Sequence, residues 1–159
     1  MKITLHPRTA ETVAIYFDKA QQPAIRSMLP QKAKTVEEAL TDFAKTQLSG
    51  ATSYGRTIYS DGRYIGDVWI YGIDVNDTPN AMLSYCIFEK GLWGKGAATE
   101  GVRLFLEEVW DRFGLQTIGA FTYAENHPSI RVLEKNGFNL EEEFIEQGMA
   151  SRYYQRRFL

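Results

Sequence analysis

The stretch Ala81–Arg112, AMLSYCIFEKGLWGKGAATEGVRLFLEEVWDR, decides the fold. Its first part, Ala81–Phe88, is an apolar run of strand length, rich in residues that suit a buried pleated sheet. Its last part repeats apolar residues at helical spacing, which predicts a helix with a buried stripe (Ala98, Val102, Phe105, Val109 and Phe113) and with Leu106 and Trp110 flanking it. Three glycines lie between the two parts. The stretch therefore predicts a strand, a glycine-rich loop and a helix.

The glycine-rich loop is a candidate anion site. A strand that turns through glycines into a helix exposes the first backbone N–H groups of that helix, where the helix dipole favours negative charge. Lys95 adds a positive charge. The spacing fits neither a Walker loop, since Ala97 and Ala98 follow Gly96, nor a dinucleotide fingerprint, since Thr99 stands where its third glycine is needed. The loop alone leaves phosphate binding and a plain tight turn both open.

The composition indicates one ordinary globular domain. The 159 residues are 44% hydrophobic and 24% charged, which suffices for a core without disulfides. The net charge of −2 argues against nucleic acid as a partner. The N-terminus lacks the apolar core of a signal peptide, and no run approaches the roughly 20 apolar residues of a membrane span. With its single cysteine, Cys86, the chain is expected to be cytoplasmic and not membrane-associated.

The residues before Ser53 predict a short strand and two helices. Lys2–His6 has strand character, and Thr9 is suited to cap a helix. Pro23 and Pro30 bound an irregular segment. Thr35 with Glu38 is typical of a capping box at the start of a second helix. The apolar faces of the two helices are Ala10, Val13, Ala14 and Phe17 in the first, and Val36, Ala39, Leu40, Phe43 and Ala44 in the second.

From Ser53 the pattern predicts a sheet. Its expected strands are Ser53–Ser60, Arg63–Tyr71, Ala81–Phe88, Gln116–Tyr123, Phe138–Ile145 and Met149–Phe158. Asp61-Gly62 and Gln147-Gly148 are placed to form hairpin turns, and the helix between the third and fourth strands implies a parallel crossover. A short helix is expected between Asn126 and Gly137, with Ile130 and Leu133 inward. We therefore predict one α/β domain over residues 1–159, with a mixed, mostly antiparallel sheet of about six to seven strands flanked by helices.

Two motifs in this order resemble a known family. GLWGKGAATE, at residues 91–100, is followed by ENHPSIRVLEKNGF at residues 125–138, and this pair is similar to the GNAT superfamily of N-acetyltransferases. Within this superfamily, the two motifs resemble those of the branch related to the ribosomal-protein N-terminal (Rim-type) acetyltransferases. The order of elements agrees over nearly the whole chain. The resemblance implies a GNAT-like fold in which the parallel strands Ala81–Phe88 and Gln116–Tyr123 splay apart at one end.

The resemblance also implies acetyl-CoA as co-substrate. In the family the loop corresponding to Gly91–Ala98 cradles the pyrophosphate, the strand segment Tyr85–Phe88 pairs with the pantetheine arm, and Asn126 matches a CoA-facing Asn. One departure is Gly91, where many members carry Gln or Arg. The implied cofactor-binding residues are Tyr85, Cys86, Ile87, Phe88, Gly91, Trp93, Gly94, Lys95, Gly96, Ala97, Ala98, Asn126 and Ser129.

The expected reaction is direct attack of a neutral primary amine on the thioester, with a thiolate leaving. A backbone N–H near Cys86–Ile87 would stabilise the oxyanion. Leu133 stands where many members carry a tyrosine acid, and Ser129 is the candidate general acid instead; the alternative is a first-turn serine that bonds the backbone. Asp67 and Glu146 are candidate bases, against the alternative that they are merely solvated carboxylates.

Other polar residues have plainer interpretations. Cys86 is expected to be a packing residue, and His6 and His127 lack metal-ligand spacing, so we predict no metal. Trp93 is expected to pack beside the loop. Glu141–Glu143 reads as a solvent-facing strand segment, although acidic groups near an acceptor cleft would favour cationic amines.

The acceptor is predicted to be a primary amine, either a protein N-terminus or a small molecule. Its pocket would come from the variable segments Gln21–Lys34, Tyr71–Thr78 and the turn at Gln147. Two other functions stay open: a catalytically silent CoA-binding module, and a dinucleotide-binding domain helped by Glu125 after the following strand. The sequence also leaves a homodimer open.

Overall fold

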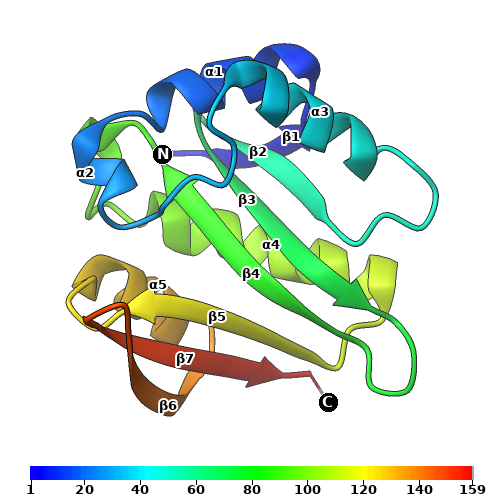
Figure 1. Ribbon diagram of the computed structural model, residues 1–159, viewed down its shortest axis with the longest axis vertical. Helices are drawn as coiled ribbons and strands as arrows, with labels where there is room; N and C mark the ends of the chain where they lie inside the picture. The colour runs from blue at the N-terminus through cyan, green and yellow to red at the C-terminus, as the bar shows by residue number, and fades with distance from the viewer. Residues whose placement is uncertain (159) are drawn as a thin grey trace.

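A computed structural model describes residues 1–158, which build one seven-stranded sheet (Figure 1). The spatial order is β1-β2-β3-β4-β5-β7-β6. Every neighbouring pair is antiparallel except β4 and β5, which run parallel. The strands are β1 (Ile3–Pro7), β2 (Tyr54–Ser60), β3 (Arg63–Asp74), β4 (Asn80–Ile87), β5 (Thr117–Tyr123), β6 (Asn139–Glu146) and β7 (Met149–Arg157).

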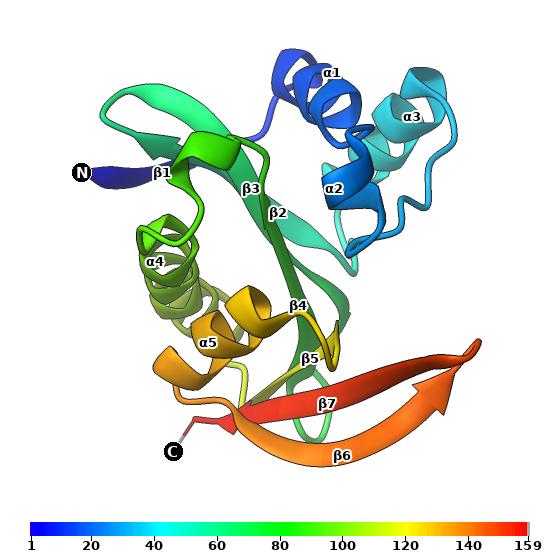
Figure 2. The same ribbon diagram turned by 90° about the vertical axis from the view of Figure 1, so that its left-hand side faces the viewer.

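Helices cover both faces of this sheet. They are α1 (Ala10–Lys19), α2 (Pro23–Arg26), α3 (Val36–Thr46), the single 3-10 turn η1 (Lys90–Leu92), α4 (Ala97–Phe113) and α5 (His127–Lys135). Figure 2 shows α1, α2 and α3 on one side, and α4 with α5 on the other. Within residues 1–158 we find no helix long and apolar enough to cross a membrane. The predicted fold class, including the parallel pair, is confirmed.

Local signals act much as the sequence predicts. Both tight hairpin turns have two residues with positive φ, Asp61-Gly62 at 50° and 81° and Gln147-Gly148 at 51° and 79°, which is the geometry that matches the twist of paired strands. The Thr35 hydroxyl accepts from the Glu38 amide. The Glu38 carboxylate, however, accepts from the Lys34 amide at 2.8 Å. The predicted capping box is therefore only half formed.

Three predictions of local structure differ from the structure. A short helix, α2, begins at Pro23 inside the segment expected to be irregular, because a four-residue helix is too short to show a period. Strand β3 continues past Tyr71 to Asp74, which still pairs with Asn80 across an irregularity. Ala44, assigned to the inner face of α3, is exposed at the end of that helix.

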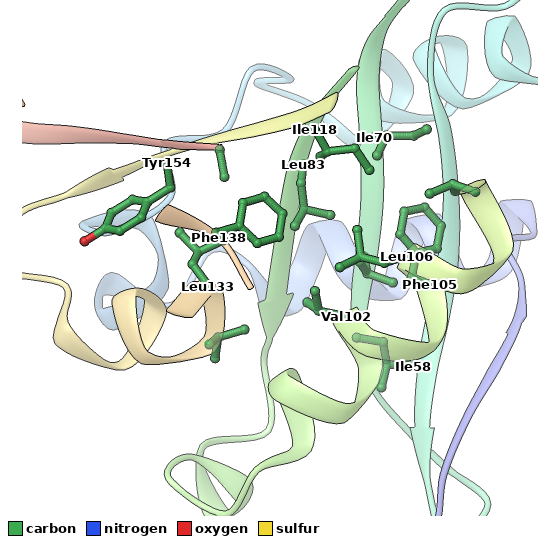
Figure 3. Close-up of a cluster of buried hydrophobic side chains, with 14 of the residues drawn as sticks. Ile58, Ile70, Leu83, Val102, Phe105, Leu106, Ile118, Leu133, Phe138 and Tyr154 are labelled. Atoms are coloured by element: carbon green, nitrogen blue, oxygen red, sulfur yellow. The ribbon is translucent and has the colours of Figure 1, made fainter. Parts of the chain in front are cut away.

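The main core lies between the sheet and α4 (Figure 3). The buried stripe of α4 is Val102, Phe105, Leu106 and Val109, so Leu106 belongs to the core and does not merely flank it. Trp110 is exposed and Phe113 only partly buried. Under α5 the same core continues through Leu133, Phe138 and Tyr154, and Ile130 is also buried there, as predicted for Ile130 and Leu133.

The parallel pair positions the site. β4 and β5 are in register at only three residue pairs, Asn80 with Thr117, Ala81 with Ile118, and Met82 with Gly119. Beyond these pairs the two strands diverge, as Figure 1 shows for their upper left-hand parts. The separation leaves one edge of β4 without a neighbouring strand. The predicted splay is therefore present.

Candidate active site

A cleft of about 580 Å³ lies where β4 and β5 separate. One wall is β4 from Leu83 to Ile87, and the loop from Leu92 to Gly96 with the first turn of α4 closes one end. The start of α5 forms the other wall, and residues of and after α2 line the remaining side. The cleft therefore brings together three stretches that are far apart in the sequence, around residues 24–29, 83–99 and 120–135.

The glycine loop presents backbone donors to this cleft. Gly94 and Gly96 have φ values of 75° and 87°, in the left-handed region that disfavours other residues. Gly96 is the N-cap of α4, and no side chain caps the helix. The N–H groups of Ala97, Ala98 and Thr99 therefore begin a helix without an intrahelical partner, and all three residues line the cleft. This is an anion site with the helix dipole behind it.

Trp93 fixes the loop against the end of β4. Its indole Nε1 donates to the carbonyl oxygen of Ile87 at 2.7 Å, so the prediction that Trp93 packs beside the loop is met. The neighbouring Cys86 carbonyl points the other way, because a Cβ added to Gly66 on β3 would lie 2.2 Å from its oxygen. Backbone groups alternate along a strand. The N–H of Ile87 and the backbone groups of Tyr85 therefore point into the splay.

A hydroxyl pair spans the cleft from β4 to α5. The Tyr85 hydroxyl donates to the Ser129 carbonyl at 3.0 Å and lies 2.7 Å from Ser129 Oγ. Ser129 is held in place by Asn126, the N-cap of α5, whose Oδ1 accepts from the Ser129 amide at 3.3 Å. Burial raises the pKa of Tyr85, so its phenol stays protonated. The sequence prediction included Tyr85 for its backbone alone and missed the hydroxyl.

Residues 2–139 match the family described as the acetyltransferase (GNAT) domain. The chain belongs to the GNAT family. A probable N-acetyltransferase of Bacillus subtilis (strain 168), YjcK, is 36% identical over 88 residues, which are 55% of this chain and 48% of that protein. The chain thus aligns with about half the length of this curated relative.

Two solved structures share the fold of this GNAT domain. Spermidine N-acetyltransferase from Vibrio cholerae, in complex with CoA and spermine, has a TM-score of 0.86 at 16% identity, over 98% of this chain and 95% of that one. The RimL ribosomal-protein α-N acetyltransferase, in complex with coenzyme A, has a TM-score of 0.82 at 17% identity, over 99% and 94%. At these identities the likeness concerns the fold. The predicted GNAT family is confirmed, and the Rim-type branch stays a prediction.

The GNAT cleft contains most of the predicted cofactor residues. Those that line it are Tyr85, Cys86, Ile87, Trp93, Gly94, Gly96, Ala97, Ala98, Asn126 and Ser129. Phe88, Gly91 and Lys95 are not in its wall. The Phe88 ring packs edge-on against Tyr64, with centroids 4.9 Å apart, and the Phe88 amide donates to Ile65 on β3. Phe88 is therefore turned to the other side of the sheet from α4.

Cys86 lies in the cleft wall with little exposure. Burial raises the pKa of its thiol to about 12, so the thiol is protonated at neutral pH and is a weak nucleophile. This agrees with the packing role expected for Cys86. The described residues contain no group of three His, Cys, Asp or Glu side chains that would hold a metal ion.

The two candidate bases lie outside the cleft. Asp67 is buried in β3, where its carboxylate accepts from Arg8 Nε at 2.9 Å and from the Tyr64 hydroxyl. Burial raises the pKa of Asp67, and Arg8 opposes that shift. Its bonds mark a structural carboxylate beneath α1. Glu146 is exposed at the end of β6 and is also absent from the cleft wall.

Two cations of the cleft were missed by the sequence analysis. Arg131 and Lys135 on α5 both line it. They lie four residues apart and therefore share one helix face. The sequence could have indicated both cations, because the four-residue spacing places them on one face of the helix that follows Asn126. Glu125, considered above only as support for a dinucleotide-binding domain, is the one carboxylate in the described cleft wall.

Proposed function

We propose that this protein is an acetyl-CoA-dependent N-acetyltransferase that transfers the acetyl group to a primary amine by direct attack in a ternary complex. One observation carries the proposal: the uncapped N-terminus of α4 and the unpaired edge of β4 meet in a single cleft. A chain of the GNAT family with this arrangement fits a ligand that has phosphates at one end and an extended polyamide arm.

The phosphate end fits the loop and α5. The free N–H groups of Ala97 and Ala98 would bind the pyrophosphate, with no side chain between them and the ligand. Arg131 and Lys135 add positive charge from the facing helix. Asn126 keeps its Nδ2 hydrogens available, because its Oδ1 is the atom that caps α5.

The reacting end fits the unpaired edge of β4. When bound, acetyl-CoA supplies an activated thioester. The backbone groups of Tyr85 that point into the splay would hold the pantetheine amides as an added strand does. The Ile87 N–H, on the same edge, is the donor we assign to the negative charge that develops on the acyl oxygen. This refines the expected Cys86–Ile87 region to one amide, since the backbone of Cys86 faces β3.

The hydroxyl pair is placed for the leaving sulfur. Ser129 Oγ lines the cleft and is bonded to Tyr85, whose phenol stays protonated. A thiol has a pKa near 8.5, so the departing thiolate is stable enough to need a hydrogen-bond donor rather than a full proton. We therefore propose that, with the cofactor bound, the Tyr85 hydroxyl donates to Ser129 Oγ, and Ser129 in turn donates a hydrogen bond to the departing sulfur.

The attacking amine enters neutral and gives up its proton after attack. Neither Asp67 nor Glu146 is part of the cleft wall, so we assign the proton to water or to Glu125. The acceptor is proposed to be a small molecule or peptide amine. A cytoplasmic location is proposed on the single Cys86 alone.

The first test is calorimetric titration with acetyl-CoA, with NADH as control. Saturable binding of acetyl-CoA alone supports the proposal, and thiol release with a panel of amines must then follow. Preferential binding of NADH would favour a dinucleotide-binding domain, which the antiparallel β2-β3-β4 meander disfavours. Tight acetyl-CoA binding without turnover of any amine would favour a silent CoA-binding module.

A further inference from the structure

We infer that the acceptor is a primary amine carrying a second positive charge at the far end of an aliphatic chain. The inference rests on the proposed function and names its acceptor class. It comes from the face of β5, β7 and β6 that lies opposite α5. That face combines an exposed aromatic patch with carboxylates and opens directly from the cleft.

Three aromatic side chains form a patch that we call the aromatic floor: Phe121, Tyr153 and Phe144. The ring of Phe121 lies 5.1 Å from that of Tyr153 and 5.9 Å from that of Phe144, measured between centroids. Phe121 is 57% exposed, although its strand is central in the sheet. A large exposed aromatic residue on a central strand marks a contact surface rather than a core.

The register of the strands explains why these rings share one face. Phe121 on β5 pairs with Tyr153 on β7, and cross-strand partners point to the same side. The alternate residues, Ala120 and Tyr154, are buried on the opposite face in the core under α5. Gly119 leaves space for the Tyr153 ring, because a Cβ at this position would lie only 2.4 Å from the Tyr153 hydroxyl oxygen. The Tyr153 ring therefore lies across β5, beside Phe121.

The aromatic floor begins at the mouth of the cleft. Phe121 belongs both to the floor and to the cleft wall, which also includes Ala120 on β5 and Ser84 on β4. Met28 and Leu29, which follow α2, line the same cleft. In Figure 1 no labelled helix lies in front of β5 and β7. An amine at the thioester would therefore extend its remaining chain over the aromatic floor.

Carboxylates lie on the same face of the hairpin. Glu142 pairs with Tyr153, and Glu146 is two residues beyond Phe144, so both share the side of the floor. Both are exposed, and the described residues place no cation within ion-pair distance of either. Glu143, on the opposite face, is bonded to Arg152 at 3.3 Å. Of this hairpin's cations, Arg157 shares the open face, but it lies at the far end of β7.

The geometry sets the size of the acceptor. Phe121 on β5 and Glu142 on β6 are separated by two strand spacings, which is about 10 Å. Aromatic faces accept methylene chains and also attract cations. An aliphatic chain would therefore cross the floor from the cleft, and its distal ammonium would meet Glu142 or Glu146. The reacting amine at the other end of the acceptor must be neutral. Glu142 and Glu146 therefore recognise the distal ammonium and not the reacting amine.

The test compares hexamethylenediamine with hexylamine, which has the same chain but no distal charge. Thiol release at saturating acetyl-CoA gives kcat/KM for each amine. We expect the diamine to exceed the monoamine by clearly more than the about twofold advantage of its two amino groups. Glu142→Gln and Glu146→Gln should each lower kcat/KM for the diamine about two- to fivefold, as exposed ion pairs do, and leave hexylamine unchanged.

Glu143→Gln is the matched control, because it neutralises a carboxylate on the same strand but on the other face. It should leave both amines unchanged. Phe121→Ala should lower kcat/KM for both amines, since both chains cross the floor. Equal use of the two amines, or a diamine rate insensitive to both Glu142→Gln and Glu146→Gln, would overturn the inference while the proposed function stands.

A separate readout keeps the two proposals apart. Calorimetric titration of the CoA complex with hexamethylenediamine should give saturable binding that Glu142→Gln weakens. Absence of thiol release with every amine, alongside such binding, would count against the proposed function but support the acceptor site. Preference for a peptide with a neutral sequence after its free N-terminus, unaffected by the two Gln variants, would overturn the inference.

Discussion

Replacement of Gly96 by Ala tests whether the glycine loop is the phosphate cradle. Gly96 has a φ of +87°, and nothing lies within 4 Å of the position that a Cβ would occupy. The methyl group therefore clashes with nothing, and the cost is conformational: the left-handed region costs an L-residue roughly 1–2 kcal/mol. Because nothing packs against this side of Gly96, we expect the backbone there to relax and turn its N–H groups away from the cleft.

Binding must then restore the strained loop. A cost of roughly 1–2 kcal/mol corresponds to an acetyl-CoA affinity weaker by about five- to thirtyfold. Gly94→Ala should act similarly, since its φ is +75° in equally open space. The entropy of the unfolded chain, which complicates stability changes at glycine, does not enter, because both states compared are folded.

The measurement is calorimetric titration with acetyl-CoA, and Gly50→Ala is the control. Gly50 has a φ of +77° and the same open surroundings, but it lies between α3 and β2, outside the cleft wall. The control should lose a similar amount of thermal stability and keep its affinity. A folded Gly96→Ala protein that binds acetyl-CoA within about twofold of the wild type would refute the cradle.

Three further results are expected. Tyr85→Phe and Ser129→Ala should each lower turnover at saturating substrates about tenfold, which is equivalent to about 1.4 kcal/mol. Neither substitution should weaken acetyl-CoA binding. Unchanged turnover in both variants would exclude a catalytic role for the pair. Gly66→Ala should reduce stability in urea by about 3 kcal/mol or more, because its Cβ would meet the Cys86 carbonyl oxygen at 2.2 Å, and an unshifted midpoint would contradict this packing. Burial raises the pKa of Tyr64 and Tyr85 above the usual 10, so these tyrosines ionise first in the unfolded chain. The free energy of unfolding should therefore be unaffected below about pH 10 and fall above it by about 1.4 kcal/mol per pH unit for each tyrosine. A melting temperature that stays constant through the alkaline range would contradict this.

Features built from the backbone were predictable from the sequence. The two hairpin turns require residues with positive φ, so the dipeptides Asp61-Gly62 and Gln147-Gly148 predict these turns. The glycines before α4 indicate a loop that presents amides, and the loop has that form. In each case glycine meets the requirement for a positive φ, which few other residue types meet. The fold followed because these local signals agree with the alternation of the strands.

Features built from side chains meeting across the fold were not predictable. Tyr85 and Ser129 are 44 residues apart and meet only because β4 and α5 face each other across the splay. Asp67 looked like a candidate base because it interrupts an apolar strand. Its partner Arg8 is 59 residues earlier, so no local pattern indicates that the carboxylate is paired. A buried charge needs such a partner, but the pattern does not name it.

The same distinction separates the cofactor end of the cleft from the acceptor end. A phosphate can be held by N–H groups that every residue carries, so the residues that matter are those permitting the backbone shape, Gly94 and Gly96 above all. An acceptor is selected by side chains, and Phe121 has the same apolar character as its buried neighbours on β5. Only the register, which turns Ala120 inward and Phe121 outward, places one in the core and leaves the other exposed for the acceptor contact that we propose. If the acceptor crosses this face as we propose, substitutions at Phe121 and its neighbours on the face would change acceptor choice and leave the glycine loop intact.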